Sequence, residues 1–108
     1  MAVDNPNVID AVGTERETGI VVLTVSDHLE WNDAHLVTLQ EKLNAYLHFV
    51  LEGQLLEDYP SARNRKIRIE VIHKHRPHTE ALAFLSKARA AIVAQGIEFV
   101  HRSLPEGY

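Results

Sequence analysis

Five residues that could bind a ligand or carry a proton lie where predicted strands end. The strands are the β-branched segment 19–27, the alternating segment 66–74 and the short segment 97–102. The residues at or just after their carboxyl ends are Asp27, His28, His73, His75 and His101. In open α/β sheets, ligands bind outside the carboxyl ends of the parallel strands. These five side chains are therefore the candidate ligand-binding residues.

The alternation of side chains along a strand selects three of the five. Alternate residues share a face, and Asp27, His73 and His101 each lie two residues after an apolar residue of their own strand. If the strands pair in register, these three meet beneath the helix layer and become candidate ligands for a divalent metal such as zinc. The alternative is that the imidazoles form hydrogen bonds with helix ends or water and that no cofactor is required.

Other catalytic patterns are missing. Ser26, Asp27 and His28 have the residue types of a hydrolytic triad, but consecutive strand residues point to opposite faces and cannot align. None of the glycine-rich elbows or phosphate-binding loops that mark common enzyme classes is present, and H-E-x-x-H is absent too. We therefore expect a non-enzymatic binding or protein-interaction domain; the opposing interpretation is a metal-binding or small-ligand-binding domain that could be an enzyme.

The run HKHRPH at 73–78 raises the question of nucleic-acid or anion binding. Six of the 11 Lys and Arg residues lie between 63 and 76. No aromatic residues interleave them for base stacking, and the whole chain has a net charge of −4. The sequence therefore disfavours nucleic acid as a partner and favours a solvated basic surface.

Length and composition set the class of protein. The chain has 108 residues and no cysteine, so a single domain over 1–108 is expected and cysteine-ligated metal is excluded. The N-terminus does not resemble a signal peptide, and no apolar run approaches the roughly 20 residues that span a bilayer. A cytoplasmic protein without membrane contact is expected. An immunity or antitoxin protein would also fit the size and charge, but no motif supports that class.

The charges are distributed unevenly along the chain. Residues 1–60 contain 11 acidic and 2 basic side chains, and residues 61–108 contain 4 and 9, which gives −9 and +5. Because apolar periodicity continues through both halves, we expect them to fold together and to neutralise each other.

Local patterns predict four strands and two main helices. Segments 7–14 and 19–27 predict a hairpin, and 66–74 and 97–102 two further strands. A helix is expected from Asn32 or Asp33 to about Glu52, with Trp31 and Leu36 as a hydrophobic staple. Residues 53–59 predict a short helical extension, and Thr79 is the expected cap of a second long helix that ends before Gly96.

The order β-β-α-β-α-β predicts an α/β (α+β) two-layer sandwich. Right-handed crossovers make the last three strands parallel and place both helices on one face of a four-stranded mixed sheet. The other face would carry apolar side chains that form a candidate interface for a homodimer: Ile20, Val22, Ile72 and Val100. The sequence identifies no other protein partner.

Three segments carry a resemblance to a known family. VDNPNVID at 3–10, SDHLEW at 26–31 and LQEKLNAYL at 39–47 resemble an uncharacterised family of small bacterial proteins. The resemblance implies a bacterial, cytosolic, single-domain protein. Since it brings no assigned activity, it transfers no functional residues to this chain.

Overall fold

The sheet and its helices follow the expected order. The computed structural model describes residues 3, 5 and 8–104. The strands are β1 (Ala11–Thr14), β2 (Val21–Asp27), β3 (Ile67–His73) and β4 (Glu98–Ser103). The helices are α1 (Asp33–Leu51), α2 (Gln54–Asp58) and α3 (Thr79–Val93), with a 3-10 turn η1 at Pro60–Ala62.

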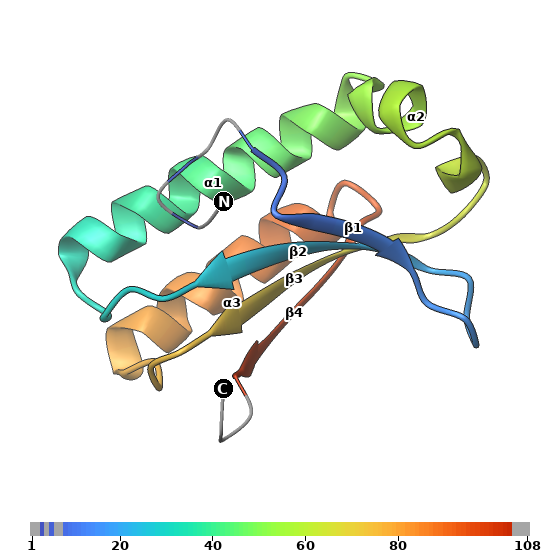
Figure 1. Ribbon diagram of the computed structural model, residues 1–108. Helices are drawn as coiled ribbons and strands as arrows, with labels where there is room; N and C mark the ends of the chain where they lie inside the picture. Colours follow the sequence, from blue (N-terminus) through green and yellow to red (C-terminus); the bar gives the residue numbers. More distant parts are fainter. Residues whose placement is uncertain (1–2, 4, 6–7, 105–108) are drawn as a thin grey trace.

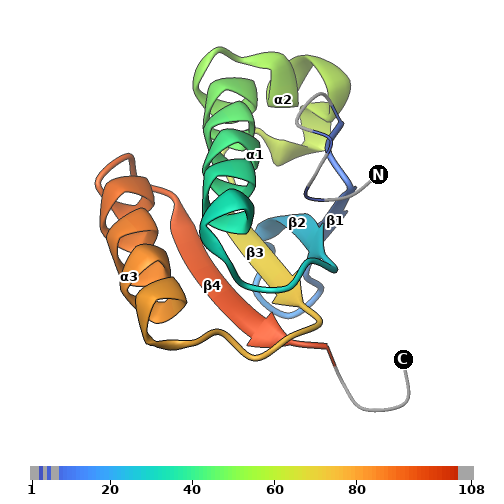
Figure 2. The same cartoon turned by 90° about the vertical axis from the view of Figure 1, so that its left-hand side faces the viewer.

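The four strands form one mixed sheet in the order β1-β2-β3-β4. β1 is antiparallel to β2, whereas β2, β3 and β4 are parallel, so their arrowheads point to the same end of the molecule in Figure 1. Figure 2 shows α1 and α3 on the same side of the sheet. The predicted two-layer α+β architecture is confirmed. Within the described residues, no helix combines the length and apolar character that crossing a bilayer requires.

The core lies between the sheet and the two long helices. The odd-numbered residues of β2 and β3 face the helices and, apart from the half-buried Ile67, are buried; their apolar members pack against apolar residues of α1 and α3. The buried residues that form the centre of this layer are Val21, Leu23, Val25, Leu39, Leu43, Ile69, Val71, Leu85, Ile92 and Phe99.

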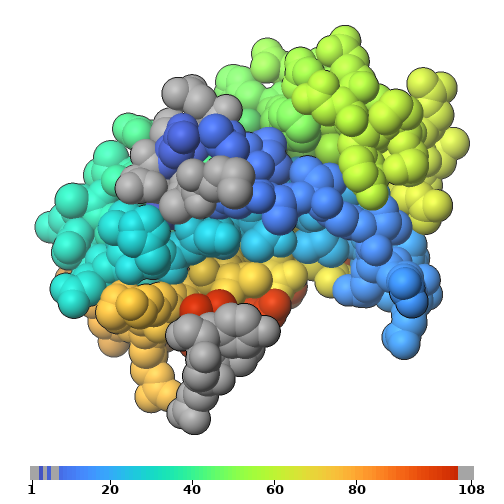
Figure 3. Space-filling view, viewed as in Figure 1, coloured from blue at the N-terminus to red at the C-terminus, as the bar shows by residue number. Residues whose placement is uncertain are grey.

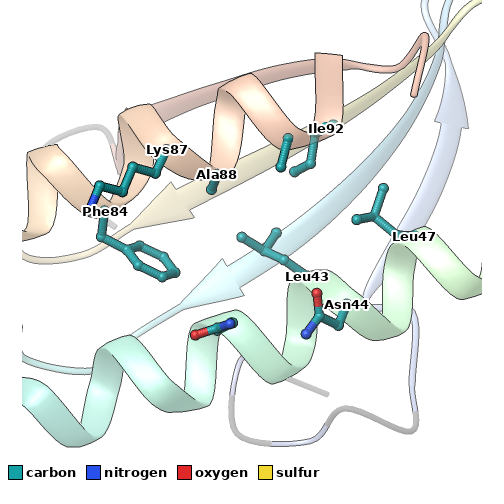
Figure 4. A pocket seen from close by; sticks show the side chains of 9 residues that line it. Leu43, Asn44, Leu47, Phe84, Lys87, Ala88 and Ile92 are labelled. Atoms are coloured by element: carbon teal, nitrogen blue, oxygen red, sulfur yellow. The ribbon is translucent and has the colours of Figure 1, made fainter. Parts of the chain in front are cut away.

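The two long helices leave a groove between them. A hollow of about 280 Å³ separates α1 from α3, with Leu43 and Leu47 on one wall and Phe84, Ala88 and Ile92 on the other (Figure 4). Its lining is mainly apolar. Its polar lining residues are Gln40, Asn44 and Lys87, and no carboxylate or histidine lines it.

The N-terminal strand is shorter than the sequence predicts. Residues 6 and 7 lie outside the described residues. Residues 8–10 do not form a strand, and Val8 and Asp10 contact α1 instead. The Lys42 ammonium is fully buried and donates to the carbonyls of Asn5 (2.6 Å) and Val8 (2.5 Å) and to the Asp10 carboxylate (2.9 Å). Since these groups bond to α1, pairing with β2 begins only at Ala11.

The ends of α1 follow the prediction, whereas the start of α3 departs from it. Asn32 caps α1 by accepting from the His35 amide, and Gly53 takes a positive φ of 88° after its end, as expected. The Trp31 ring stacks on His35, and the hydrophobic staple with Leu36 stays a prediction. His78, not Thr79, caps α3, because its Nδ1 accepts from the Ala81 amide.

The second face of the sheet is open but not continuously apolar. Figure 3 looks onto this face, where no long helix covers β2 and β3. Val22 lies beside Arg68, Ile72 beside Arg102, and Val100 beside Glu70 in the strand register. Ile20 precedes β2 and is only 8% exposed, so its predicted place in an open interface is wrong.

Candidate functional site at the carboxyl ends of the strands

Two histidines meet at the carboxyl ends of β3 and β4. His73 ends β3, and His101 lies beside Val71 in the register of β4. The Nε2 atom of His73 is 3.1 Å from the Nδ1 atom of His101, so one ring donates a hydrogen bond to the other. The structure therefore brings together two of the three side chains for which the sequence predicts convergence.

Asp27 is the third, and it bonds to a residue that the sequence does not single out. Asp27 pairs with His73 in the register of β2 and β3. Its Oδ2 atom, however, lies 2.6 Å from Nε2 of His35, and its Oδ1 atom accepts from the Leu29 amide. The carboxylate is thus occupied by α1 and by the turn that leads into it.

Both ring nitrogens of the buried His35 face oxygen atoms. Nδ1 of His35 faces the Glu30 carbonyl at 3.0 Å, and a carbonyl can only accept. Nε2 faces a carboxylate oxygen, so both ring nitrogens have acceptor partners. The geometry fits an imidazolium next to a carboxylate, and the side chains are only 1% and 0% exposed.

Trp31 joins the buried pair to the histidines. Its ring stacks on His35 with centroids 4.1 Å apart, and it lies in a T-shaped arrangement with His73 at a centroid distance of 5.9 Å. Its Nε1–H donates to the carbonyl of His75 at 2.8 Å. An aromatic face against a cationic ring is favourable, and more so when water is excluded. Trp31 therefore ties the start of α1 to the loop after β3.

The other two candidates take different positions. His75 contributes its backbone carbonyl to Trp31. His28 is exposed and lines a separate hollow that it shares with Asp27 and Lys74. Across the described ranges, no three His, Asp or Glu side chains are grouped so that they could hold a metal ion. The commitment of Asp27 to His35 accounts for this at the predicted metal site.

Burial keeps the two meeting histidines neutral. It is the largest cause that lowers the pKa of His73, and the neighbouring His101 lowers it further. Partial burial, and then the charge of Arg89, lower the pKa of His101. Nδ1 of His73 is buried without a hydrogen-bond partner. A buried polar atom left unpaired costs about 1–3 kcal/mol, so a hydrogen-bond partner at this atom would be stabilising.

These histidines open onto a basic hollow. It has a volume of about 420 Å³ and is lined by residues of β3, β4 and the start of α3: His73, Arg76, Pro77, Leu82, His101, Arg102 and Ser103. None of these seven residues is acidic. Arg102 donates to Glu70, whereas Arg76 forms no ion pair with any of the described residues. The hollow can therefore accept negative charge.

Comparison with known proteins assigns the chain to a family. The model of a family of unknown function (DUF6572) matches residues 1–104. The chain belongs to this family. For this DUF6572 protein, neither the curated proteins nor the solved structures yielded a match. The family carries no assigned activity, so the function must be argued from the site itself.

Sequence reasoning missed two buried polar residues of α1, His35 and Lys42. Their positions follow the helical spacing of the buried residues Leu39, Leu43 and Tyr46. Helical periodicity therefore contains a signal for both, because it places them on the face that packs against the sheet. A polar residue on such a face requires partners, and these partners are the residues of the network described above.

Proposed function

We propose that this protein is a non-enzymatic binding domain that holds a small anion, a carboxylate or a phosphate, in the basic hollow at the ends of β3 and β4. The observation that carries the proposal is the lining, which combines two arginines and two histidines with no acidic side chain. The hollow lies at the carboxyl end of the parallel strands, where ligands of α/β sheets bind.

The chemistry of the lining favours an anion. Arginine presents a planar set of donors that matches carboxylate and phosphate oxygens. Arg76 is exposed at the rim, and the Ser103 hydroxyl adds a neutral donor. A bound anion would also stabilise protonated His73 and His101, whose pKa values are lowered by burial. Binding should therefore strengthen as the pH falls.

Burial of the only acid-base pair in the site supports binding over catalysis. The side chains of His35 and Asp27 are almost fully buried, and the Trp31 ring stacks on His35. A general base must reach the substrate within hydrogen-bond distance. This pair instead supports the wall of the hollow through Trp31 and His73.

An NMR titration tests the proposal. Sodium phosphate and sodium acetate are added separately at constant ionic strength, and the imidazole signals of His73 and His101 are followed. Both signals should shift in a saturable manner, and the exposed His48 on α1 serves as an internal control. If all three signals respond equally, or none does, the proposal fails.

A matched pair of variants locates the binding site. Loss of a charge-assisted hydrogen bond costs about 1.5–3 kcal/mol, so Arg76→Gln should weaken binding roughly tenfold or more. Arg63→Gln changes an exposed arginine next to η1 and should leave affinity unchanged. Equal affinities in the two variants would show that binding takes place elsewhere.

Metal binding stays a prediction and can be measured in the same way. The prediction concerns His73 and His101, whose side chains meet and line the same hollow. Zinc should then broaden or shift the His73 signal at substoichiometric concentration, and unchanged spectra would rule out the metal site.

Cellular setting and the sheet-face dimer also stay predictions. A bacterial, cytoplasmic protein is what the sequence resemblance suggests. A dimer through the open face would place Val22, Ile72 and Val100 against a second copy, although each lies beside a charged or polar side chain. Val22→Glu should then abolish a dimer seen by sedimentation, and an unchanged mass would exclude this face.

A further inference from the structure

Among the residues that the structure describes, none pairs with the backbone groups at the outer edge of β4. β4 is the last strand of the sheet and pairs only with β3 (Figure 2). Leu104 donates its amide to the carbonyl of His73, so residue 104 faces β3. Because strand residues alternate in the direction of their backbone groups, the amides and carbonyls of Phe99, His101 and Ser103 point away from the sheet. Such an edge is ready to pair with another strand.

We infer that two copies of this chain pair through antiparallel β4 strands about a two-fold axis at Val100. In this register Phe99 exchanges backbone hydrogen bonds with His101 of the second copy, and His101 with Phe99 of that copy. The partner is therefore a second copy of the chain, and the two sheets join into one.

Charge complementarity selects this register. The even-numbered residues of β4 lie on the open face, and in this pairing Glu98 faces Arg102 of the second copy at both ends of the contact. Opposite charges on directly facing residues stabilise antiparallel strands. A shift that places His101 on the axis would instead set Arg102 against Val100. A further shift would set Arg102 against Arg102.

Ion pairs within each chain extend the complementarity. Arg68 bonds to Glu98 at 3.1 Å and to Glu15 at 3.3 Å, and Arg102 bonds to Glu70. Pairing would align these groups into a row of alternating sign across the two copies, from Glu15 through Arg68 and Glu98 to Arg102 and Glu70 of the second copy. The same surface is therefore complementary to itself, as a two-fold contact requires.

The centre of the contact is apolar. Val100 is 40% exposed in the single chain, although a valine in a strand usually packs against a neighbour. On the axis, Val100 meets its own copy at a position without direct hydrogen bonds, where side chains approach most closely. The exposed valine at the free edge thus finds a partner.

Disulfide trapping tests the register directly, because the chain contains no cysteine. Facing residues without hydrogen bonds lie about 4.5 Å apart between Cα atoms, which a disulfide spans. Val100→Cys should form a covalent dimer under mild oxidation at micromolar concentration. Val37→Cys, at an exposed valine of α1, is the matched control and should stay monomeric. Equal crosslinking of both variants would overturn the inference.

A charge-reversal series measures the noncovalent dimer by analytical ultracentrifugation. Arg102→Glu should raise the dissociation constant at least about tenfold, because two attractive pairs become repulsive. Adding Glu98→Arg to that variant should restore much of the affinity. Circular dichroism establishes that each variant is folded. A wild-type mass equal to one chain up to submillimolar concentration, or no rescue by the double change, would refute the edge dimer, and neither result depends on anion binding.

Discussion

Replacement of His35 by leucine is expected to destabilise the fold strongly. The change removes the partner of Asp27, which is 3% exposed, and leaves a carboxylate in the core. Breaking a buried ion pair in this way costs about 3–5 kcal/mol. For a domain of this size such a loss lowers the melting temperature by more than about 10 °C. Urea denaturation at neutral pH measures it.

A second substitution separates lost charge pairing from lost packing. Asp27→Asn should destabilise the wild type, because it removes the carboxylate that faces the imidazolium. In the His35→Leu variant the same change should be stabilising by about 1 kcal/mol or more, because it removes an unpaired buried charge. The effect of one substitution should therefore change sign with the background.

An exposed pair on the same helix provides the control. His48 and Glu52 are 3.5 Å apart, with side chains that are 72% and 73% exposed. Such pairs contribute less than about 1 kcal/mol, so His48→Leu should have little effect. The reasoning is refuted if His35→Leu costs less than about 1 kcal/mol, or if Asp27→Asn is destabilising in both backgrounds.

Three further predictions concern stability. Lys42→Met should cost about 3 kcal/mol and speed amide hydrogen exchange near Val8, since it breaks a buried charged contact; unchanged exchange would contradict the proposed anchoring. The free energy of unfolding should fall as the pH drops below about 6.5, because folding lowers the pKa values of His73 and His101 and the unfolded chain therefore binds more protons. Urea titrations at several pH values measure this dependence, and His73→Gln should flatten it. Gly53→Ala should cost about 1 kcal/mol because φ is +88°, whereas Gly13→Ala, with open space around it, should be nearly neutral by thermal melting.

Much of the fold could be predicted because its determinants are local. The alternation in Lys66–Lys74 and the β-branched run before Asp27 identify their strands within a few residues. Once strands alternate with helices, right-handed crossover connections fix the direction of β2, β3 and β4. The meeting of His73 and His101 also follows from parity and direction, without knowledge of distant contacts.

The remaining features depend on contacts between distant parts of the chain. β1 begins later than predicted because Val8 and Asp10 bond to Lys42 and Tyr46, more than 30 positions away, and no local pattern encodes this preference. The bond between Asp27 and His35 joins a predicted metal ligand to a helix residue that the strand pattern does not indicate. His78 displaces Thr79 as a cap because an imidazole nitrogen can accept in place of a hydroxyl, which propensity rules give little weight.

The buried lysine has a consequence for how the chain assembles. Its ammonium joins carbonyls that lie 37 and 34 positions earlier in the sequence. During synthesis the first residues must therefore wait until α1 has emerged before their oxygens find a donor. Val3, which is fully buried, belongs to the same early segment. We therefore expect this segment to join the core only after α1 has formed. A bulky fusion before residue 3 would obstruct this step.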